Sequence, residues 1–414
     1  MSDSSSVQLF FVEETIWGEI PNDGASPEGA PNLDEFRFTN DSLTQTTETA
    51  VTEEIRSDRQ VSDIIRTAVS AGGEVGIELS FESHDALLAG ALYRDFSTEV
   101  NETGVVASFT TTSPGPGTFT LAASPLPSPN WLLNVIPGQF LRISGSANSP
   151  TNDGFFKVAS VDAAAGTIIF TSGPASDEVA GTFDVRGQFV FNSVIRKSFT
   201  IEKQFSDVIV DTDSPETGVF HYFTGMRVGT ASLTIAPGAI INGSFTFEGK
   251  QAFSVGATIG DGAPTEVSAA DVLNAVDNIT DILIDGVEDP DCSFTNVEFS
   301  IENNLRAQPC IGQLANSGIG LGRTNVTGTI EAYLLDRAFF ERYLNFDTVS
   351  LSFRATLADD SYIFDFPAIK FISGTAETSG NDADVLVSVE FNAKRDPTSD
   401  FMVAINKFPA GTTP

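Results

Sequence analysis

Apolar and polar residues alternate strictly in several short segments, and this pattern predicts strands with one face in a core. The apolar residues of the four clearest segments are Val75, Ile77, Leu79 and Phe81, then Phe245 and Phe247, then Val326, Ile330, Ala332 and Leu334, and then Val387, Val389 and Phe391. The opposite faces are polar and partly acidic. Sheets of this kind expose one face to solvent, while a helix covers the other face.

Two of these strands run into a similar short helical segment, so the chain repeats itself. Residues 79–92, "LSFESHDALLAGAL", have a second version at residues 332–344, "AYLLDRAFFERYL". Upstream, "FRFTNDSL" at residues 36–43 resembles "FTNVEFSI" at residues 294–301. An internal repeat governs the fold and has to be recognised before local structure is assigned. We therefore expect two copies of one β-rich unit, each with a flanking short helix.

The first copy contains extra sequence that the second lacks. Between its helix and the strand-like "GQFVFNSV" lies a stretch that is rich in Pro and Gly at first and then predicts three short strands. We read this stretch as a small inserted β domain that faces outward. The expected division is a first unit at 8–103 plus 188–255, the insertion at 104–187, a connecting segment at 256–291 and a second unit at 292–410.

Two long polar connections occupy matching positions in the two copies. Thr44 to Gly73 and Asn303 to Arg323 are both longer than ordinary hairpin loops. Connections of this length in a compact domain are usually functional or become ordered by a partner. We interpret them as assembly arms, with flexible segments that have no role as the alternative.

Charge changes the picture of the possible partners. The 414 residues carry a net charge of −34, which disfavours nucleic-acid binding through basic contacts. One interpretation is solubility in a crowded medium. The other is a surface that DNA must pass without adhering. No apolar run approaches the length of a membrane helix, and the N-terminal residues do not resemble a signal peptide, so we expect folding in a cytoplasm.

Candidate catalytic and metal-binding residues are sparse. Cys292 and Cys310 are expected to be free thiols in a reducing compartment, with a disulfide as the alternative. His84 and His221 are interpreted as structural, and neither lies near a cysteine pair. The acidic turn 285–291 lacks the ligand spacing of a calcium loop. We expect no enzyme activity, no cofactor and no metal.

Three segments of the sequence resemble a known protein family. The segments "FTNVEFSIENNLRAQPCIG", "GLGRTNVTGTIEAYLLD" and "FTGMRVGTASLTIAPGAIINGSFTFEGK" resemble the tail tube proteins of long-tailed, siphovirus-type bacteriophages. The resemblance spans nearly everything except the insertion. It implies a mainly β fold with two tandem β-sandwich or split-barrel units, whose inner sheets join those of neighbours into a ring around a DNA channel. Two units per chain imply a homotrimeric, pseudo-hexameric ring.

The same resemblance implies a structural virion protein of the phage tail. It would be made and assembled in the bacterial cytoplasm, with further copies of itself, a tape-measure protein, a tail terminator and baseplate or initiator proteins as partners, and with no membrane. Genomic DNA would pass through the tube transiently during ejection. On the strand pattern, we place the carboxylates of Glu78, Glu248, Glu331 and Glu390 on the lumen face, although the opposite face is the alternative.

Two rival functions remain open at this stage. The first is a phage adhesin or carbohydrate-binding structural protein that acts through the inserted domain. The second is a hydrolase on an acidic β scaffold, since 56 acidic residues leave many carboxylate pairs possible. No spacing singles out any such pair.

Overall fold

The structure is a computed structural model that describes residues 3–21, 29–111, 115–121, 130–146, 152–209, 217–262, 264–267, 270–288, 294–334, 338–377 and 384–409. The chain forms two compact units, and each mixes distant parts of the sequence. Unit 1 contains residues 1–94, 194–275 and 296–329, whereas unit 2 contains residues 95–193, 276–295 and 330–414. The expected mainly β fold is confirmed, since 25 strands and two α-helices make up the regular structure described.

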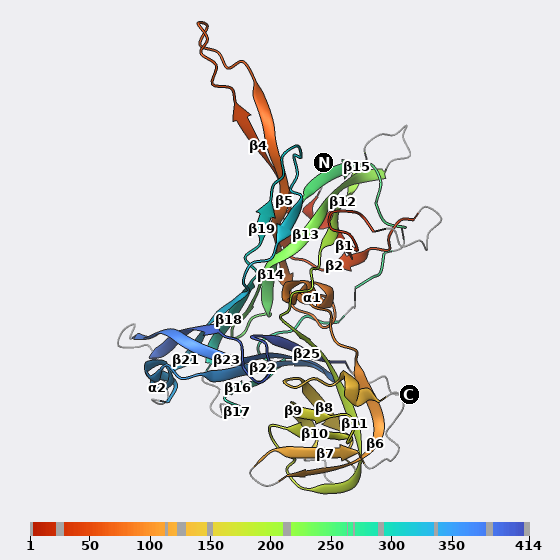
Figure 1. Ribbon diagram of the computed structural model, residues 1–414, viewed down its shortest axis with the longest axis vertical. Coiled ribbons are helices and arrows are strands. Elements are labelled where there is room, and N and C mark those ends of the chain that lie inside the picture. The colour runs from red at the N-terminus through yellow and green to blue at the C-terminus, as the bar shows by residue number, and fades with distance from the viewer. Residues whose placement is uncertain are drawn as a thin grey trace. The chain divides into compact units, whose positions relative to one another are not determined.

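The central sheet of unit 1 is antiparallel throughout. Its strands follow the spatial order β3, β5, β14, β13 and β18 (Figure 1). Their bounds are Asn40–Asp41, Ile64–Glu78, Asn242–Gly249, Thr217–Ile235 and Phe294–Glu302. One face of this sheet is apolar and buried, with Val75, Ile77, Phe245, Phe247, Ala231, Leu233, Ile235, Val297, Phe299 and Ile301. The alternation in the sequence therefore predicted which residues of β5 and β14 face the core.

Further strands complete unit 1. β1 pairs with β2 and β12, and β13 joins β12 to β15. Their bounds are Val7–Glu13 for β1, Asp34–Phe36 for β2, Phe199–Ile209 for β12 and Gln251–Val255 for β15, with a 3₁₀ turn at Ser4–Ser6. A buried carboxylate ties these strands together, because Glu14 accepts hydrogen bonds from Thr200 and from the Gly225 amide.

The helix of the first copy, α1 (Asp85–Leu92), is buried along its length from Leu87 onward. Gly90 allows it to approach Phe199 and Val228, and Tyr93 ends it in a left-handed conformation with φ 51°. His84 holds the N-cap position, while the Ser83 hydroxyl donates to the Phe81 carbonyl and pairs with the Ser80 hydroxyl.

His84 should make folding sensitive to acid. Burial lowers its pKa to about 4, although Nε2 donates to the Arg37 carbonyl at 3.0 Å. Below pH 6.5 the imidazole of His84 binds a proton in the unfolded chain, whereas in the folded chain it stays neutral down to about pH 4. The free energy of unfolding therefore falls between pH 6.5 and 4. We expect a loss of about 2 to 3 kcal/mol by pH 4.5 from this group. Urea titrations should show a smaller pH dependence for His84→Phe, and an equal dependence would contradict the assignment.

The two long polar connections are β-hairpins in unit 1. β4 (Thr44–Val51) pairs with the first half of β5 and extends away from the sheet as a long arm (Figure 1). β19 (Arg306–Gln308) pairs with β20 (Gly318–Gly320) to form a shorter arm. The two arms meet where the Val69 amide donates to the Leu314 carbonyl at 2.9 Å. We predicted no strands in either connection because Thr-rich polar strands resemble loops in sequence.

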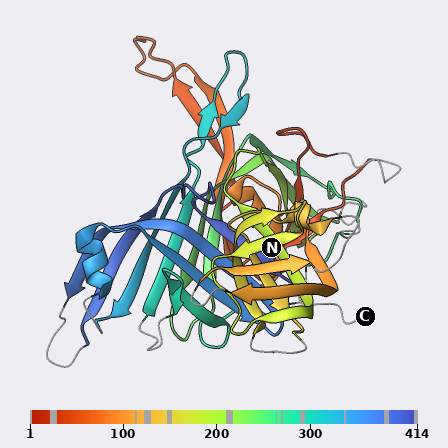
Figure 2. The same ribbon diagram turned by 60° about the horizontal axis from the view of Figure 1, so that its bottom comes forward.

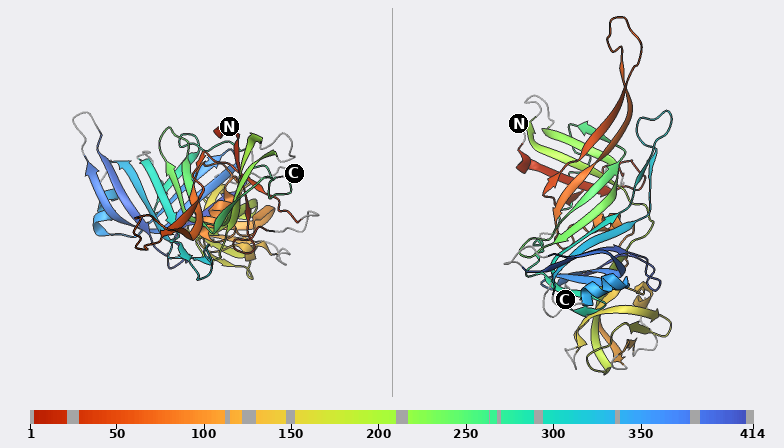
Figure 3. Two further views of the ribbon diagram at one scale, coloured as in Figure 1. Left: turned by 90° about the horizontal axis from the view of Figure 1, so that it is seen from above. Right: turned by 90° about the vertical axis from the view of Figure 1, so that its left-hand side faces the viewer.

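The strands of unit 2 pair in antiparallel ladders, and this unit contains the second helix. β22 and β23 form a hairpin, β16 and β17 extend it beside β22, and β24 and β25 pair with β23. Their bounds are Ile279–Ile284 for β16, Val287–Glu288 for β17, Val349–Leu357 for β22, Asp360–Glu377 for β23, Leu386–Ala393 for β24 and Ala404–Phe408 for β25. β21 (Asn325–Tyr333) begins in unit 1 and ends in unit 2. α2 (Ala338–Asn345) contacts β23 (Figure 3).

Burial in the second copy follows the predicted alternation except at one residue. Val326, Ile330, Ala332, Val387, Val389 and Phe391 are all buried. Leu334 is exposed, so its predicted place in the core is wrong. Leu334 lies one residue beyond β21, and its amide donates to the Val385 carbonyl.

The extra sequence of the first copy forms a compact β structure within unit 2 (Figure 2). Its elements are β6 (Val100–Thr111), β7 (Gly117–Leu121), a 3₁₀ turn at Trp131–Asn134, β8 (Phe140–Ser144), β9 (Gly154–Asp162), β10 (Thr167–Phe170) and β11 (Glu178–Phe191). The three strands predicted from the sequence here are present as β8, β9 and β10. At the centre of its core, Phe109 makes edge contacts with Phe119, Phe156 and Phe170. The proposed boundaries of the two copies and of the insertion stay a prediction.

The inserted strands pack firmly on the sheet of unit 2. The Phe140 amide donates to Asn406 at 2.8 Å, and Phe155 contacts Phe408 edge to face. The guanidinium of Arg354 lies 4.4 Å from the centre of the Phe155 ring. The insertion therefore shares a core with β23 and β25, which a domain hanging on a loop would not.

Candidate acidic sheet face

The second face of the unit 1 sheet is polar from one strand to the next. The registers align Glu78 with Asn242 and Asn242 with Thr234, which in turn lies opposite Glu298. Further rows share this composition: Gly76 with Ser244, Ser232 and Ser300, and Glu74 with Thr246, Thr230 and Glu302. Since residues directly opposite each other in a ladder point to the same side, all these polar groups share one face. We call it the acidic face.

Five carboxylates lie on the acidic face, namely Glu74, Glu78, Glu248, Glu298 and Glu302. The structure thus brings together the predicted residues Glu78 and Glu248. It adds three that we did not propose as lumen residues, two of them from β18. Alternation in "VEFSIE" at residues 297–302 carries this signal, because Glu298 and Glu302 fall between buried residues.

The carboxylates of the acidic face are not neutralised by ion pairs with the described residues. None of the five carboxylates takes part in an ion pair in the part of the chain that the structure describes. Arg227 lies opposite Glu248 in the ladder, yet its guanidinium donates to the Ile319 carbonyl and lies near Trp17. The acidic face therefore carries uncompensated negative charge.

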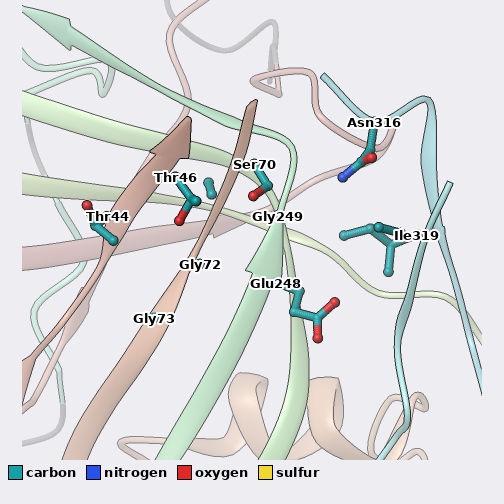
Figure 4. Close-up of a pocket in the computed structure, with 11 residues that line it drawn as sticks. Thr44, Thr46, Ser70, Gly72, Gly73, Glu248, Gly249, Asn316 and Ile319 are labelled. Atoms are coloured by element: carbon teal, nitrogen blue, oxygen red, sulfur yellow. The ribbon is translucent and has the colours of Figure 1, made fainter. Parts of the chain in front are cut away.

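Glu248 lines a cavity of about 380 Å³ at the root of the long arm (Figure 4). The walls include Thr44, Thr46, Ser70, Gly72 and Gly73 from the arm, with Asn316 and Ile319 from the shorter arm. Figure 4 shows the Glu248 carboxylate on this side of β14. The surrounding walls reduce hydration of the carboxyl and raise its pKa. The cavity is open, and its walls mix hydroxyl, amide and carboxylate groups with glycine, alanine and isoleucine.

The other two predicted residues belong to unit 2. Glu331 lies on β21 between buried Ile330 and Ala332, and Glu390 lies on β24 between buried Val389 and Phe391. Each therefore occupies the polar side of its strand, as the alternation predicted. Glu390 is exposed and lies opposite Ser373 of β23. Whether any of the four lines a lumen stays a prediction.

Other candidate chemistry has little structural support. Across the described segments, no three His, Cys, Asp or Glu side chains cluster in a way that could hold a metal ion. Cys310 is an exposed free thiol near the tip of the shorter arm, while Cys292 and residues 289–291 of the acidic turn lie outside the described residues. His84 packs against Phe36 and Phe245. No described helix has both the length and the apolar character needed to cross a membrane.

Comparison with known proteins agrees with this architecture. No curated protein matched the chain. The family described as phage tail tube protein matches residues 4–393, which covers both units and the insertion. Members of this family are structural components of the virion tail that assemble into a tube with other tail proteins, which argues against an enzyme. The chain belongs to the phage tail tube protein family.

Proposed function

We propose that this chain assembles into stacked rings whose channel conducts DNA from the virion to the host. The main support for this proposal is the acidic face of unit 1. Five carboxylates that form no ion pair with a described residue lie on one side of a sheet whose other side is a buried core. A channel wall of this kind repels DNA phosphates over about 8 to 10 Å at physiological salt. The genome then slides along the tube axis and does not adhere to the wall.

Each ring contains three chains in this proposal. The two sequence copies supply two sheets per chain, so three chains give six similar sheets around the axis, with Glu331 and Glu390 adding to the acidic wall. Cyclic closure followed by stacking produces a tube. Assembly occurs in the bacterial cytoplasm with a tape-measure protein, a tail terminator and baseplate or initiator proteins.

The arms connect neighbouring rings in the proposed tube. The long arm is solvent-exposed over most of its length and carries the exposed apolar residues Val51, Ile55, Val61, Ile64 and Ile65. Exposed apolar patches of this kind mark protein interaction sites. The tip of the shorter arm adds Ile311, which is also fully exposed.

Shortening the long arm should block tube growth without unfolding the chain. Replacing residues 52–63 by a two-residue turn removes residues that are exposed apart from half-buried Thr52, so the melting temperature should change little. We expect rings in electron micrographs but few tubes, because the deletion removes Ile55 and Val61 from the apolar contact between rings. The control replaces exposed Val179 of the insertion by Ser. Tubes of normal length from the shortened variant would rule out the arm as a ring connector.

Electron microscopy of the concentrated, purified chain tests the proposed function as a whole. We expect rings that stack into tubes with an open channel. A chain that stays monomeric at high concentration, with or without an initiator complex, would contradict the proposal. Such a monomer with measurable glycan affinity would favour the adhesin alternative.

A further inference from the structure

One junction inside unit 1 joins the two sequence copies. β13 comes from the first copy and β18 from the second, and they pair from Thr230 opposite Glu302 to Ile235 opposite Val297. Directly after β18, the Asn303 amide nitrogen donates to the Gly229 carbonyl at 2.8 Å. The Asn303 side chain donates to the Ala91 carbonyl at the end of α1, at 2.9 Å. A strand of one copy thus covers both the sheet edge and the helix of the other.

Unit 2 repeats the elements that receive this strand. β13 has a bulge between Val228 and Thr230 where it pairs with β14, and β23 has the same bulge between Phe371 and Ser373 where it pairs with β24. This alignment makes Ile372 the counterpart of Gly229, and Thr375 the counterpart of Ser232. Both helices end in a left-handed residue, Tyr93 at φ 51° and Phe346 at φ 56°.

In unit 2, however, nothing described covers these elements. Residues 370–377 of β23 pair only with β24 in the described part of the chain, so their other edge is open. Ala91 and Tyr93 are 1% and 2% exposed in unit 1, whereas their counterparts Leu344 and Phe346 are 65% and 54% exposed. Ile372 is 47% exposed.

The open edge and the apolar side chains form one continuous surface. Tyr343 of α2 packs on Gly374, where an added methyl group would lie 2.8 Å from the ring. The Lys370 ammonium donates to the Phe346 carbonyl at 2.6 Å. An unpaired strand edge beside exposed Leu344, Phe346 and Ile372 is both a template for a further strand and an apolar contact site.

The chain also contains a second segment that resembles β18 and has an open edge. Residues 36–43 resemble residues 294–301 in sequence, and this correspondence places Ser42 at the position of Ser300 and Gln45 at that of Asn303. In the part of the chain described, β3 and β4 pair with β5 alone, so their other edge is open as well. Thr39, Asn40 and Ser42 are exposed and uncharged, and Asp41 is neutralised by Lys203 at 2.7 Å.

We infer that the open edge of β23 and the exposed face of α2 bind residues 39–45 of a second copy of this chain, in the register of the β13 to β18 junction. Ser42 of one copy then lies opposite Thr375 of the next, and Gln45 approaches Ile372. The inference rests on the proposed ring, and it identifies the two surfaces that close it. Because the two surfaces differ, the contact is heterologous, and its repetition gives a ring when the rotation between copies closes.

A disulfide tests the register directly. Directly opposed residues of antiparallel strands have Cα atoms about 4.5 to 5.5 Å apart, which suits a disulfide. In a background with Cys292→Ser and Cys310→Ser, we expect Ser42→Cys combined with Thr375→Cys to give covalently linked trimers on mild oxidation of assembled protein. The control combines Ser42→Cys with Ser388→Cys. Ser388 lies opposite Thr375 on β24, so it is two strands, or about 10 Å, from Ser42 and should not react.

A second variant tests the apolar contact. Ile372→Asp places a charge on a side chain that is exposed in the free chain, so the monomer should stay folded while the yield of rings falls about tenfold or more. Val179→Asp, at an apolar residue of the insertion that is even more exposed, should assemble normally. Rings and tubes that form without the Ser42 to Thr375 link, and that tolerate Ile372→Asp, would overturn this inference while leaving the proposed function intact. Absence of rings from the unmodified chain would overturn both.

Discussion

Reversing the charge of the acidic face should make the channel bind DNA tightly. In the variant with Glu74, Glu248 and Glu298 all replaced by Lys, we expect rings and tubes to form, because these side chains are exposed and make no ion pair in the described structure. The new ammonium groups line the channel and pair with phosphates. Affinity of the tubes for duplex DNA should rise on the order of a thousandfold at low salt, with a steep salt dependence. Phage assembled with this variant should lose infectivity because the genome adheres during ejection.

A matched variant separates local charge from total charge. Glu19, Glu99 and Glu266 are also exposed, but none lies on the acidic face. Changing these three to Lys alters the net charge of −34 by the same amount. We expect this control to bind DNA weakly and to support infection. Equal DNA binding by both triple variants would show that the acidic face does not line the channel.

Asp365→Ala should have the largest effect on stability. The carboxylate is only 2% exposed and accepts a hydrogen bond from the Lys157 ammonium of the insertion at 2.6 Å. Burial raises the pKa of Asp365, and the ion pair with Lys157 opposes that shift. Removing the carboxylate leaves the Lys157 ammonium without its counter-charge in the interface between β9 and β23, which costs about 3 to 5 kcal/mol. Chemical denaturation of the full chain measures this loss.

Two comparisons make the Asp365 result specific. Asp359→Ala removes a carboxylate that is 77% exposed and pairs with Arg142 at 3.5 Å, so it should cost about 1 kcal/mol or less. The double variant Asp365→Ala with Lys157→Met should recover much of the stability, since no buried charge is left unpaired. A loss of similar size in the Asp365 and Asp359 variants would contradict the view that the insertion is fixed to unit 2.

Strand alternation allowed much of the fold to be predicted from sequence. Val75, Ile77, Phe245 and Phe247 are buried as expected. In a strand with one face in the core and the other in solvent, every second residue points into the core. Alternation also placed Glu78 and Glu248 correctly on one polar face. Glu298 and Glu302 were missed, because alternation at residues 297–302 marks the polar side of β18 but does not show that β18 pairs with β13, which is distant in sequence.

Three features depended on tertiary packing and were not predicted. The arms form regular hairpins because β4 and β5 pair in register, although their Thr-rich sequence resembles a polar loop. The insertion packs on β23 and β25 through Phe140, Phe155 and Lys157, none of which has a distinctive sequence context. The exposure of Leu344 on α2 and of Phe346 just after it was also unforeseen, since apolar residues beside a helix are usually buried.

We propose a tube of three-chain rings with the acidic face toward the channel. Cryo-electron microscopy of tubes assembled from the purified chain, at a resolution that traces strands, is the decisive measurement. We expect three chains per ring, with Glu74, Glu78, Glu248, Glu298 and Glu302 facing the channel. Rings of six chains, or a channel lined by the opposite face of the sheet, would contradict it.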